Sequence, residues 1–188
     1  MRKVGGEDDF RNKTIDFAPL ERRGCRRIIP LCKESARRSG SGGGPPHTSV
    51  ENSRDIIRGV LSEPETYAVV LKESQKPIGS VGIMTGSHSN LEISDEEGEI
   101  GYWIGVPYWG QGLIPEAVRE LIRYGFEELN LTTIWCAYFD GNEKSRRVQE
   151  KCGFRYHHTN KNVLWHLTNE RKTEHVTCLP REQWKKSS

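Results

Sequence analysis

The stretch Gly105–Ala117, GVPYWGQGLIPEA, decides how the middle of this chain folds. Apolar residues come first, two glycines follow, and Pro115 then opens a helical pattern. Proline suits a first helical turn because the N–H group that it lacks would have no partner there. Gly110 and Gly112 have no Cβ, so another group can approach their backbone closely. The residues alone leave two interpretations: the glycines only turn the chain, or they admit a phosphate to the start of the helix.

Apolar periodicity predicts the elements on both sides of this stretch. Strands are predicted at 66–73, 78–84, 99–106 and 133–139, and in two later segments, NVLWHL (162–167) and HVTCL (175–179). Helices are predicted at 49–61, 115–129 and 143–151, the last one capped by Asn142. Strands alternate with helices only in the middle of the chain. We therefore expect an α+β fold with a mixed central sheet flanked by helices.

Composition narrows the class of protein. The 188 residues fit one domain, and the net charge of +2 argues against a partner held mainly by nucleic-acid phosphates. No apolar run is long enough for a bilayer, and the N-terminal MRKVGGEDDF has no apolar signal core. The five cysteines include no CxxC pair, so neither a disulfide framework nor a metal site is indicated. We expect a cytoplasmic protein that binds no nucleic acid, membrane or metal.

Two longer motifs resemble one family. The glycine turn lacks the Gly-Lys-Ser/Thr of a P-loop and the GxGxxG spacing of a dinucleotide fold. In contrast, GEIGYWIGVPYWGQGLIPEAVRELIRYGFEELNL (98–131) followed by AYFDGNEKSRRVQEKCGF (137–154) resembles the N-acetyltransferases of the GNAT superfamily, and most of all its RimJ/RimL-like branch. The resemblance covers residues 45–179. It implies an acetyltransferase domain over residues 45–184.

The resemblance implies acetyl-CoA as co-substrate. In this family two neighbouring parallel strands splay apart, and the pantetheine arm lies between them against free backbone groups, here those of Ile104 and Val106. The pyrophosphate binds at a Gln/Arg-x-x-Gly-x-Gly/Ala loop, where Trp109 and Ile114 depart from the pattern and Gly112 follows it. The implied cofactor contacts are Ile104, Val106, Trp109, Gly110, Gln111, Gly112, Leu113, Ile114, Asn142 and Ser145.

Two residues are candidates for the chemistry of acetyl transfer. An acceptor amine must lose a proton, and Glu99 opens the strand on which family members carry a base. The other interpretation of Glu99 is an exposed carboxylate at a strand end, beside Glu96 and Glu97. Ser145 matches the residue that RimL-like enzymes place near the departing thiolate. Its other interpretation is a serine in the first turn of a helix, bonded to Asn142.

The expected reaction is direct attack of a primary amine on acetyl-CoA within a ternary complex. The acceptor is a protein N-terminus, another peptide or a small amine, and the protein is a monomer or a homodimer. Two alternatives remain open. One is an acyl-CoA-binding remnant with weak or no catalysis, and the other is a non-enzymatic α+β interaction module whose glycines only turn the chain.

Residues 1–44 do not fit the rest of the chain. The segment is basic and glycine-rich, and we expect a leader that is disordered or translated out of frame. The sequence from Ile15 to Glu21 can be encoded so that a shift of one base reads Leu-Ile-Leu-Arg-Pro-Trp, the usual first strand of the family. We therefore expect the first strand and the first helix of the fold to be missing, which would leave a sheet edge unpaired.

Overall fold

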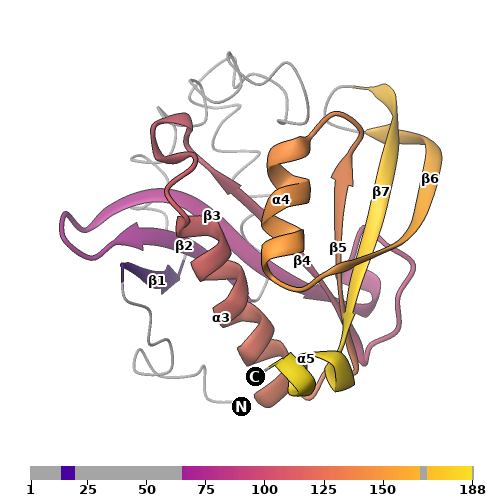
Figure 1. Ribbon diagram of the computed structural model, residues 1–188, viewed down its shortest axis with the longest axis horizontal. Coiled ribbons are helices and arrows are strands. Elements are labelled where there is room, and N and C mark those ends of the chain that lie inside the picture. Colours follow the sequence, from indigo (N-terminus) through magenta and orange to yellow (C-terminus); the bar gives the residue numbers. More distant parts are fainter. Residues whose placement is uncertain (1–13, 20–64, 166–168, 188) are drawn as a thin grey trace.

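The computed structural model describes residues 14–19, 65–165 and 169–187 (Figure 1). The helix predicted at 49–61 and most of the predicted leader lie outside these ranges. Within them, no helix is both long enough and apolar enough to cross a membrane.

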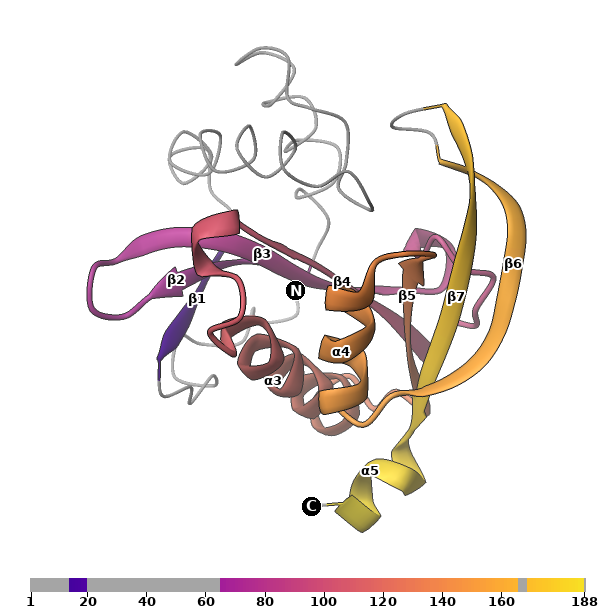
Figure 2. The same ribbon diagram turned by 45° about the horizontal axis from the view of Figure 1, so that its top comes forward.

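The centre of the fold is one seven-stranded sheet (Figures 1 and 2). In chain order its strands are β1 (Ile15–Pro19), β2 (Thr66–Leu71), β3 (Lys76–Thr85), β4 (Glu97–Ile104), β5 (Thr133–Phe139), β6 (Arg155–Trp165) and β7 (Glu170–Pro180). Their order across the sheet is β1-β2-β3-β4-β5-β7-β6. Every neighbouring pair is antiparallel except β4 and β5, which are parallel. The predicted mixed α+β sheet is confirmed.

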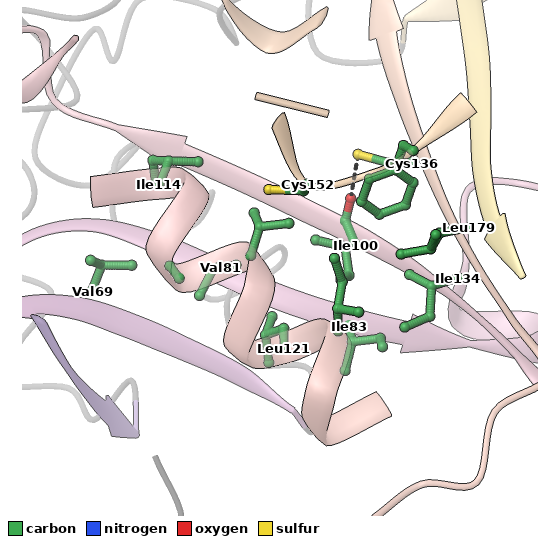
Figure 3. Packing of buried hydrophobic residues seen from close by; sticks show 14 of the residues in the cluster. Val69, Val81, Ile83, Ile100, Ile114, Leu121, Ile134, Cys136, Cys152 and Leu179 are labelled. Carbon is green, nitrogen blue, oxygen red and sulfur yellow. Dashed lines mark hydrogen bonds between the residues drawn. The ribbon is translucent and has the colours of Figure 1, made fainter. Parts of the chain in front are cut away.

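Helices α3 (Leu113–Glu127) and α4 (Glu143–Lys151) lie side by side against one face of this sheet, and α5 (Arg181–Ser187) follows β7 (Figure 2). The apolar residues of α3 recur every three or four positions, so they form one stripe that faces the strands. Val118 and Leu121 on this stripe are completely buried, as is Ile134 on β5. Figure 3 shows the resulting core between α3 and the strands β3, β4 and β5.

The bounds of most elements differ from the prediction at one end or both, and the differences in β4, α3 and β6 have local explanations. β4 ends at Ile104 rather than at residue 106, because residues 106–108 form a short 3₁₀ turn, η2 (Val106–Tyr108). α3 begins at Leu113, two residues before the proline that marks its first turn. β6 begins at Arg155, well before the predicted 162, and it contains two register shifts that blur its alternation in the sequence.

β1 corrects an expectation about the start of the chain. The first strand is predicted to be lost, yet Ile15–Pro19 pairs antiparallel with β2 over all five residues. Strands pair through backbone groups, so β1 can form although its side chains are unusual for the family. The completely buried side chain of Ile15 also packs β1 against the core. The N–H of Thr14 also donates to Oε1 of Glu116 on α3, at 2.8 Å. The prediction of a lost first strand is therefore wrong for these residues.

Close contact between β3 and β4 leads to a prediction about stability. A Cβ added to Gly79 would lie 2.4 Å from the backbone oxygen of Trp103 and 3.0 Å from Cα of Ile104. Since backbone atoms cannot rotate away, Gly79→Ala is expected to lower the free energy of unfolding by about 3 kcal/mol, measured by urea denaturation. Gly101→Ala is the matched control, because its Cβ would meet only the flexible end of Met84, at 3.4 Å. Equal stability of the two variants would contradict this account.

Candidate active site

Strands β4 and β5 separate after three residue pairs. The paired residues are Glu97 with Thr133, Gly98 with Ile134 and Glu99 with Trp135. Both strands continue beyond these pairs, and we call the unpaired stretch, residues 100–104 opposite 136–139, the β4–β5 gap. Because the N–H of Gly105 donates to the carbonyl of Ile78 on β3, alternation along β4 turns the backbone groups of Tyr102 and Ile104 towards the gap.

Side chains occupy the narrow part of the gap. The thiol of Cys136 donates to the carbonyl oxygen of Ile100 at 3.1 Å (Figure 3). Burial raises the pKa of this thiol well above its usual range, so it remains a neutral donor. Further along β5, the side-chain amide of Gln149 on α4 donates to the carbonyl of Ala137 at 3.0 Å. Side chains of the protein therefore satisfy two of the backbone carbonyls that the separation of β4 and β5 leaves without a ladder partner.

The glycine turn presents a row of free backbone donors. Gly110 and Gly112 have φ angles of 75° and 80°, which glycine adopts without strain. A Cβ at either position would meet no atom of the described residues within 4 Å, so these residues leave the space in front of the turn open. Among the described residues, no acceptor bonds the N–H groups of residues 110–114. Five successive donors at the positive end of α3 suit an anion.

Trp109 connects this turn to the end of β4 and to α4. Its indole Nε1 donates to the carbonyl of Ile104 at 3.0 Å, and its backbone N–H donates to the carbonyl of Val106 at 3.1 Å. Nζ of Lys144, from the first turn of α4, lies 3.4 Å from the centre of the Trp109 ring. The amide of Gln111 donates to the carbonyl of Pro107 at 2.9 Å.

These contacts correct part of the predicted cofactor site. The carbonyls of Ile104 and Val106, predicted to be free, already accept hydrogen bonds from Trp109. The N–H of Ile104 still points to the gap, and that of Val106 has no acceptor in the described part of the chain. The side chains of Leu113 and Ile114 point into the core, so only their N–H groups face the turn.

Glu99 is buried rather than exposed, with 7% of its surface accessible. Oε2 of its carboxylate accepts from the hydroxyl of Ser89 at 2.8 Å and from the backbone N–H of Asn90 at 2.7 Å. Oε1 has no hydrogen bond within the described ranges. The interpretation of Glu99 as an exposed strand-end carboxylate is therefore wrong. Nothing in the sequence indicates that Ser89 and Asn90 would bind this carboxylate.

Ser145 lies in the first turn of a helix as one of its two interpretations predicts, and its place near the departing thiolate stays a prediction. Its N–H donates to Oδ1 of Asn142 at 3.2 Å, so the predicted helix cap is confirmed. Its hydroxyl oxygen lies 2.8 Å from the hydroxyl of Tyr102 on β4 and 3.2 Å from the amide nitrogen of Gln149. Burial raises the pKa of Tyr102 well above its usual range, so this phenol keeps its proton.

Tyr102 and Gln149 are site residues that sequence reasoning missed. Gln149 is 1% exposed, although it stands in the most polar helix of the chain. One signal was present: Gln149 precedes Cys152 by three positions, so it lies on the buried stripe of α4 and not on its wet face. A buried amide in such a place needs hydrogen-bond partners, and the gap supplies them.

His157 and His158 are adjacent in the sequence and lie on β6, at a register shift between Tyr156 and His158. This shift breaks the alternation of side chains, and Nδ1 of His157 lies 2.7 Å from Nδ1 of His158. Alternation predicts that the two rings point to opposite faces, and the bulge explains why they meet instead.

A sheet that opens between two parallel strands, beside a helix start with free amides, defines an α+β protein built to hold an extended anionic ligand. The sequence profile of the acetyltransferase (GNAT) domain matches residues 26–155. The chain belongs to this family. The match begins inside the segment that we expected to be a leader.

Relatives and solved structures agree with this family. The chain is 46% identical over 76 residues to YdaF of Bacillus subtilis (strain 168), whose name describes a candidate ribosomal N-acetyltransferase; this covers 40% of the chain and 41% of YdaF. It is 30% identical over 114 residues to the uncharacterized N-acetyltransferase p20 of Bacillus licheniformis, covering 58% and 61%. The chain thus spans less than two thirds of these relatives. The fold is similar to a GNAT-family acetyltransferase from Bacillus anthracis, with a TM-score of 0.76, 19% identity and coverage of 92% and 98%.

Proposed function

We propose that this protein transfers the acetyl group of acetyl-CoA to a primary amine. The observation that carries the proposal is the row of five N–H groups at residues 110–114, which have no acceptor in the described structure and lie beside the β4–β5 gap. Any helix start leaves N–H groups facing water, but here the two left-handed glycines extend the row ahead of α3, so that five donors lie together beside the gap. Membership of the acetyltransferase family supports the same reaction.

The residues present fit such a ligand. The diphosphate would be held by the N–H groups of residues 110–114, where both glycine positions leave open space. Lys144, which stacks on Trp109, would add a positive charge at the same place. The pantetheine arm would lie along the gap near Ile104, with Asn142 and Ser145 on its α4 side. Trp109 and Ile114, which depart from the pattern of the family, would contribute through the backbone and the packing of the turn.

The chemistry needs little beyond placement and proton transfer. Bound acetyl-CoA supplies a thioester whose carbonyl carbon accepts the amine nitrogen as the carbon–sulfur bond breaks. Glu99 takes the proton of the amine, directly or through water, because Oε2 is held by Ser89 and Asn90 while Oε1 has no partner among the described residues. On the α4 side, the hydroxyls of Ser145 and Tyr102 provide a donor for the sulfur.

The identity of the acceptor stays a prediction. The name of YdaF favours a ribosomal-protein N-terminus, and a small amine is the other candidate. The cytoplasmic location and a monomeric or homodimeric state also remain predictions. So does the out-of-frame origin of residues 1–44 outside β1, which the nucleotide sequence of the gene decides: a shift of one base must produce the usual first helix of the family.

Two measurements test the proposed function. Isothermal calorimetry with coenzyme A is expected to show binding, whereas no binding at millimolar ligand would favour a module whose glycines only turn the chain. Release of the thiol from acetyl-CoA in the presence of a panel of peptides and small amines is expected to identify the acceptor. Binding without thiol release for any amine would instead indicate an inactive acyl-CoA-binding remnant.

A further inference from the structure

We propose that Gln149 is a positioning residue that directs the hydroxyl proton of the Ser145–Tyr102 pair towards the departing sulfur. The inference deepens the proposed function and rests on it. Gln149 lies outside the predicted site, and its side chain touches α4, β4, β5 and β7 through hydrogen bonds. Each of these bonds restricts the direction of the next one.

The orientation of the Gln149 amide follows from its partners. A backbone carbonyl can only accept, so the atom that lies 3.0 Å from the carbonyl oxygen of Ala137 must be the nitrogen Nε2. Oε1 then faces β7, where the hydroxyl of Thr177 lies 2.8 Å away and can donate to it. The opposite orientation would place two acceptor oxygens against each other. The amide is therefore fixed without reference to any ligand.

The fixed amide determines what Ser145 can do. Nε2 has two hydrogens, and the one that Ala137 does not accept points to the hydroxyl oxygen of Ser145, at 3.2 Å. That oxygen has two lone pairs. The hydroxyl of Tyr102 lies 2.8 Å from it and 3.2 Å from the backbone carbonyl oxygen of Ser145, and it fills the second lone pair when it donates to the serine hydroxyl. With both lone pairs occupied, the proton of Ser145 remains for an outside acceptor. When a thiolate leaves, this proton can form a hydrogen bond to the sulfur and stabilise its negative charge.

The position of Gln149 explains why an amide is used here. Ala137 belongs to the part of β5 that has no ladder partner on β4, so its carbonyl would otherwise be buried without a donor. An apolar side chain could fill this volume, but it would leave the carbonyl of Ala137 without a donor and would remove one of the two donors to the hydroxyl oxygen of Ser145. Gln149 therefore meets a structural need of the gap and, through its second hydrogen, sets the direction of hydrogen bonding at the site.

The pKa of the thiol of bound coenzyme A tests this inference without requiring turnover. A hydrogen bond to the sulfur stabilises the thiolate, so the wild-type protein is expected to lower the thiol pKa by about 1 unit from that of free coenzyme A titrated in parallel. Ultraviolet absorbance of the thiolate during a pH titration of the complex measures this pKa. Gln149→Met, which keeps the size and removes the donor, is expected to lose the shift, as is Ser145→Ala. The double variant is expected to lose no more than either single one.

Thr177→Val is the matched control. It removes the hydroxyl on the Oε1 side of Gln149 and leaves Nε2 on Ala137 and Ser145, so it costs stability and keeps the thiol pKa of the wild type. In turnover, Gln149→Met is expected to reduce kcat about 10- to 100-fold with little change in KM for acetyl-CoA. If Gln149→Met does not fold, Gln149→Glu replaces the amide donor at similar size and is expected to show the same loss.

The outcomes separate the two proposals. If coenzyme A does not bind, the proposed function fails and this inference fails with it. If coenzyme A binds and the wild type and Gln149→Met have the same thiol pKa, only the role of Gln149 is overturned. Equal losses in Gln149→Met and Thr177→Val would also overturn it, because they would show that the variants act through stability alone.

Discussion

Glu99→Gln is expected to lower kcat for an amine acceptor by about 100- to 10,000-fold, because the substituted side chain can no longer take the proton of the amine. Glutamine has the same shape and can keep one oxygen on the donors of Ser89 and Asn90, so the fold is expected to persist. The variant must rely on amine that has already lost its proton. Below the pKa of the acceptor amine, about 8 for a protein N-terminus and about 10 for a lysine-like small amine, its kcat is therefore expected to rise about tenfold per pH unit, and initial rates across a pH series measure this.

Glu97→Gln is the control for this prediction. Glu97 lies two residues earlier on the same face of β4, where its carboxylate accepts from the indole of Trp135 at 3.0 Å and from Ser94. It removes the same charge from the same strand, yet kcat is expected to remain close to that of the wild type. A similar loss in both variants would show that the sheet needs negative charge here and would exclude Glu99 as a specific base.

Gly112→Ala is expected to weaken binding of coenzyme A by about 10- to 100-fold, the equivalent of losing one or two charge-assisted hydrogen bonds. The new Cβ would occupy the space in front of the free N–H groups, where no atom of the described residues lies within 4 Å. The left-handed φ of 80° adds a folding cost of about 1–2 kcal/mol. Isothermal calorimetry measures the affinity, and thermal unfolding without ligand measures the folding cost.

Gly153→Ala separates these two effects. Gly153 has a φ of 90° and lies just after the C-terminal end of α4, whereas Lys144 and the glycine turn are at its N-terminal end. A Cβ added to Gly153 would lie 3.8 Å from Leu179. Its folding cost should therefore equal that of Gly112→Ala, with no effect on coenzyme A. If both variants lose affinity equally, the glycine turn is a turn and not a diphosphate site.

The sequence predicted best where one local signal had one structural solution. The alternation of β5 and the cap of α4 at Asn142 follow from residues close together in the chain, and both agree with the structure. The glycine turn was also placed correctly, because left-handed φ values and a free helix start need glycine at Gly110 and Gly112. These signals were sufficient for the fold class, and the site that they indicate stays a prediction.

The rest depended on contacts between distant parts of the chain. The indole of Trp109 donates to the carbonyl of Ile104. The position of Trp109 in the motif does not reveal which way its ring points, so this bond could not be predicted. The sequence around Gln149 is typical of the exposed face of a charged helix. Its burial becomes clear only from its hydrogen bonds to Ala137 on β5 and Thr177 on β7. β1 was missed for another reason: an unusual composition around it masked a short strand that needs only a backbone and one buried side chain, Ile15.

The three residue pairs between β4 and β5 have a mechanical consequence. They are the ladder pairs that join two half-sheets, β1-β2-β3-β4 on one side and β5-β7-β6 on the other, and the N–H of Thr132 adds one bond to the carbonyl of Glu96 beside them. The two halves can therefore rotate slightly about that junction without breaking any other ladder. A ligand that lies along both open strand edges would tie the halves together, and at one hundred times its Kd it would raise the free energy of unfolding by about 2.7 kcal/mol. The rigidity of the two strand ends at the β4–β5 gap would then depend on whether the ligand is bound there.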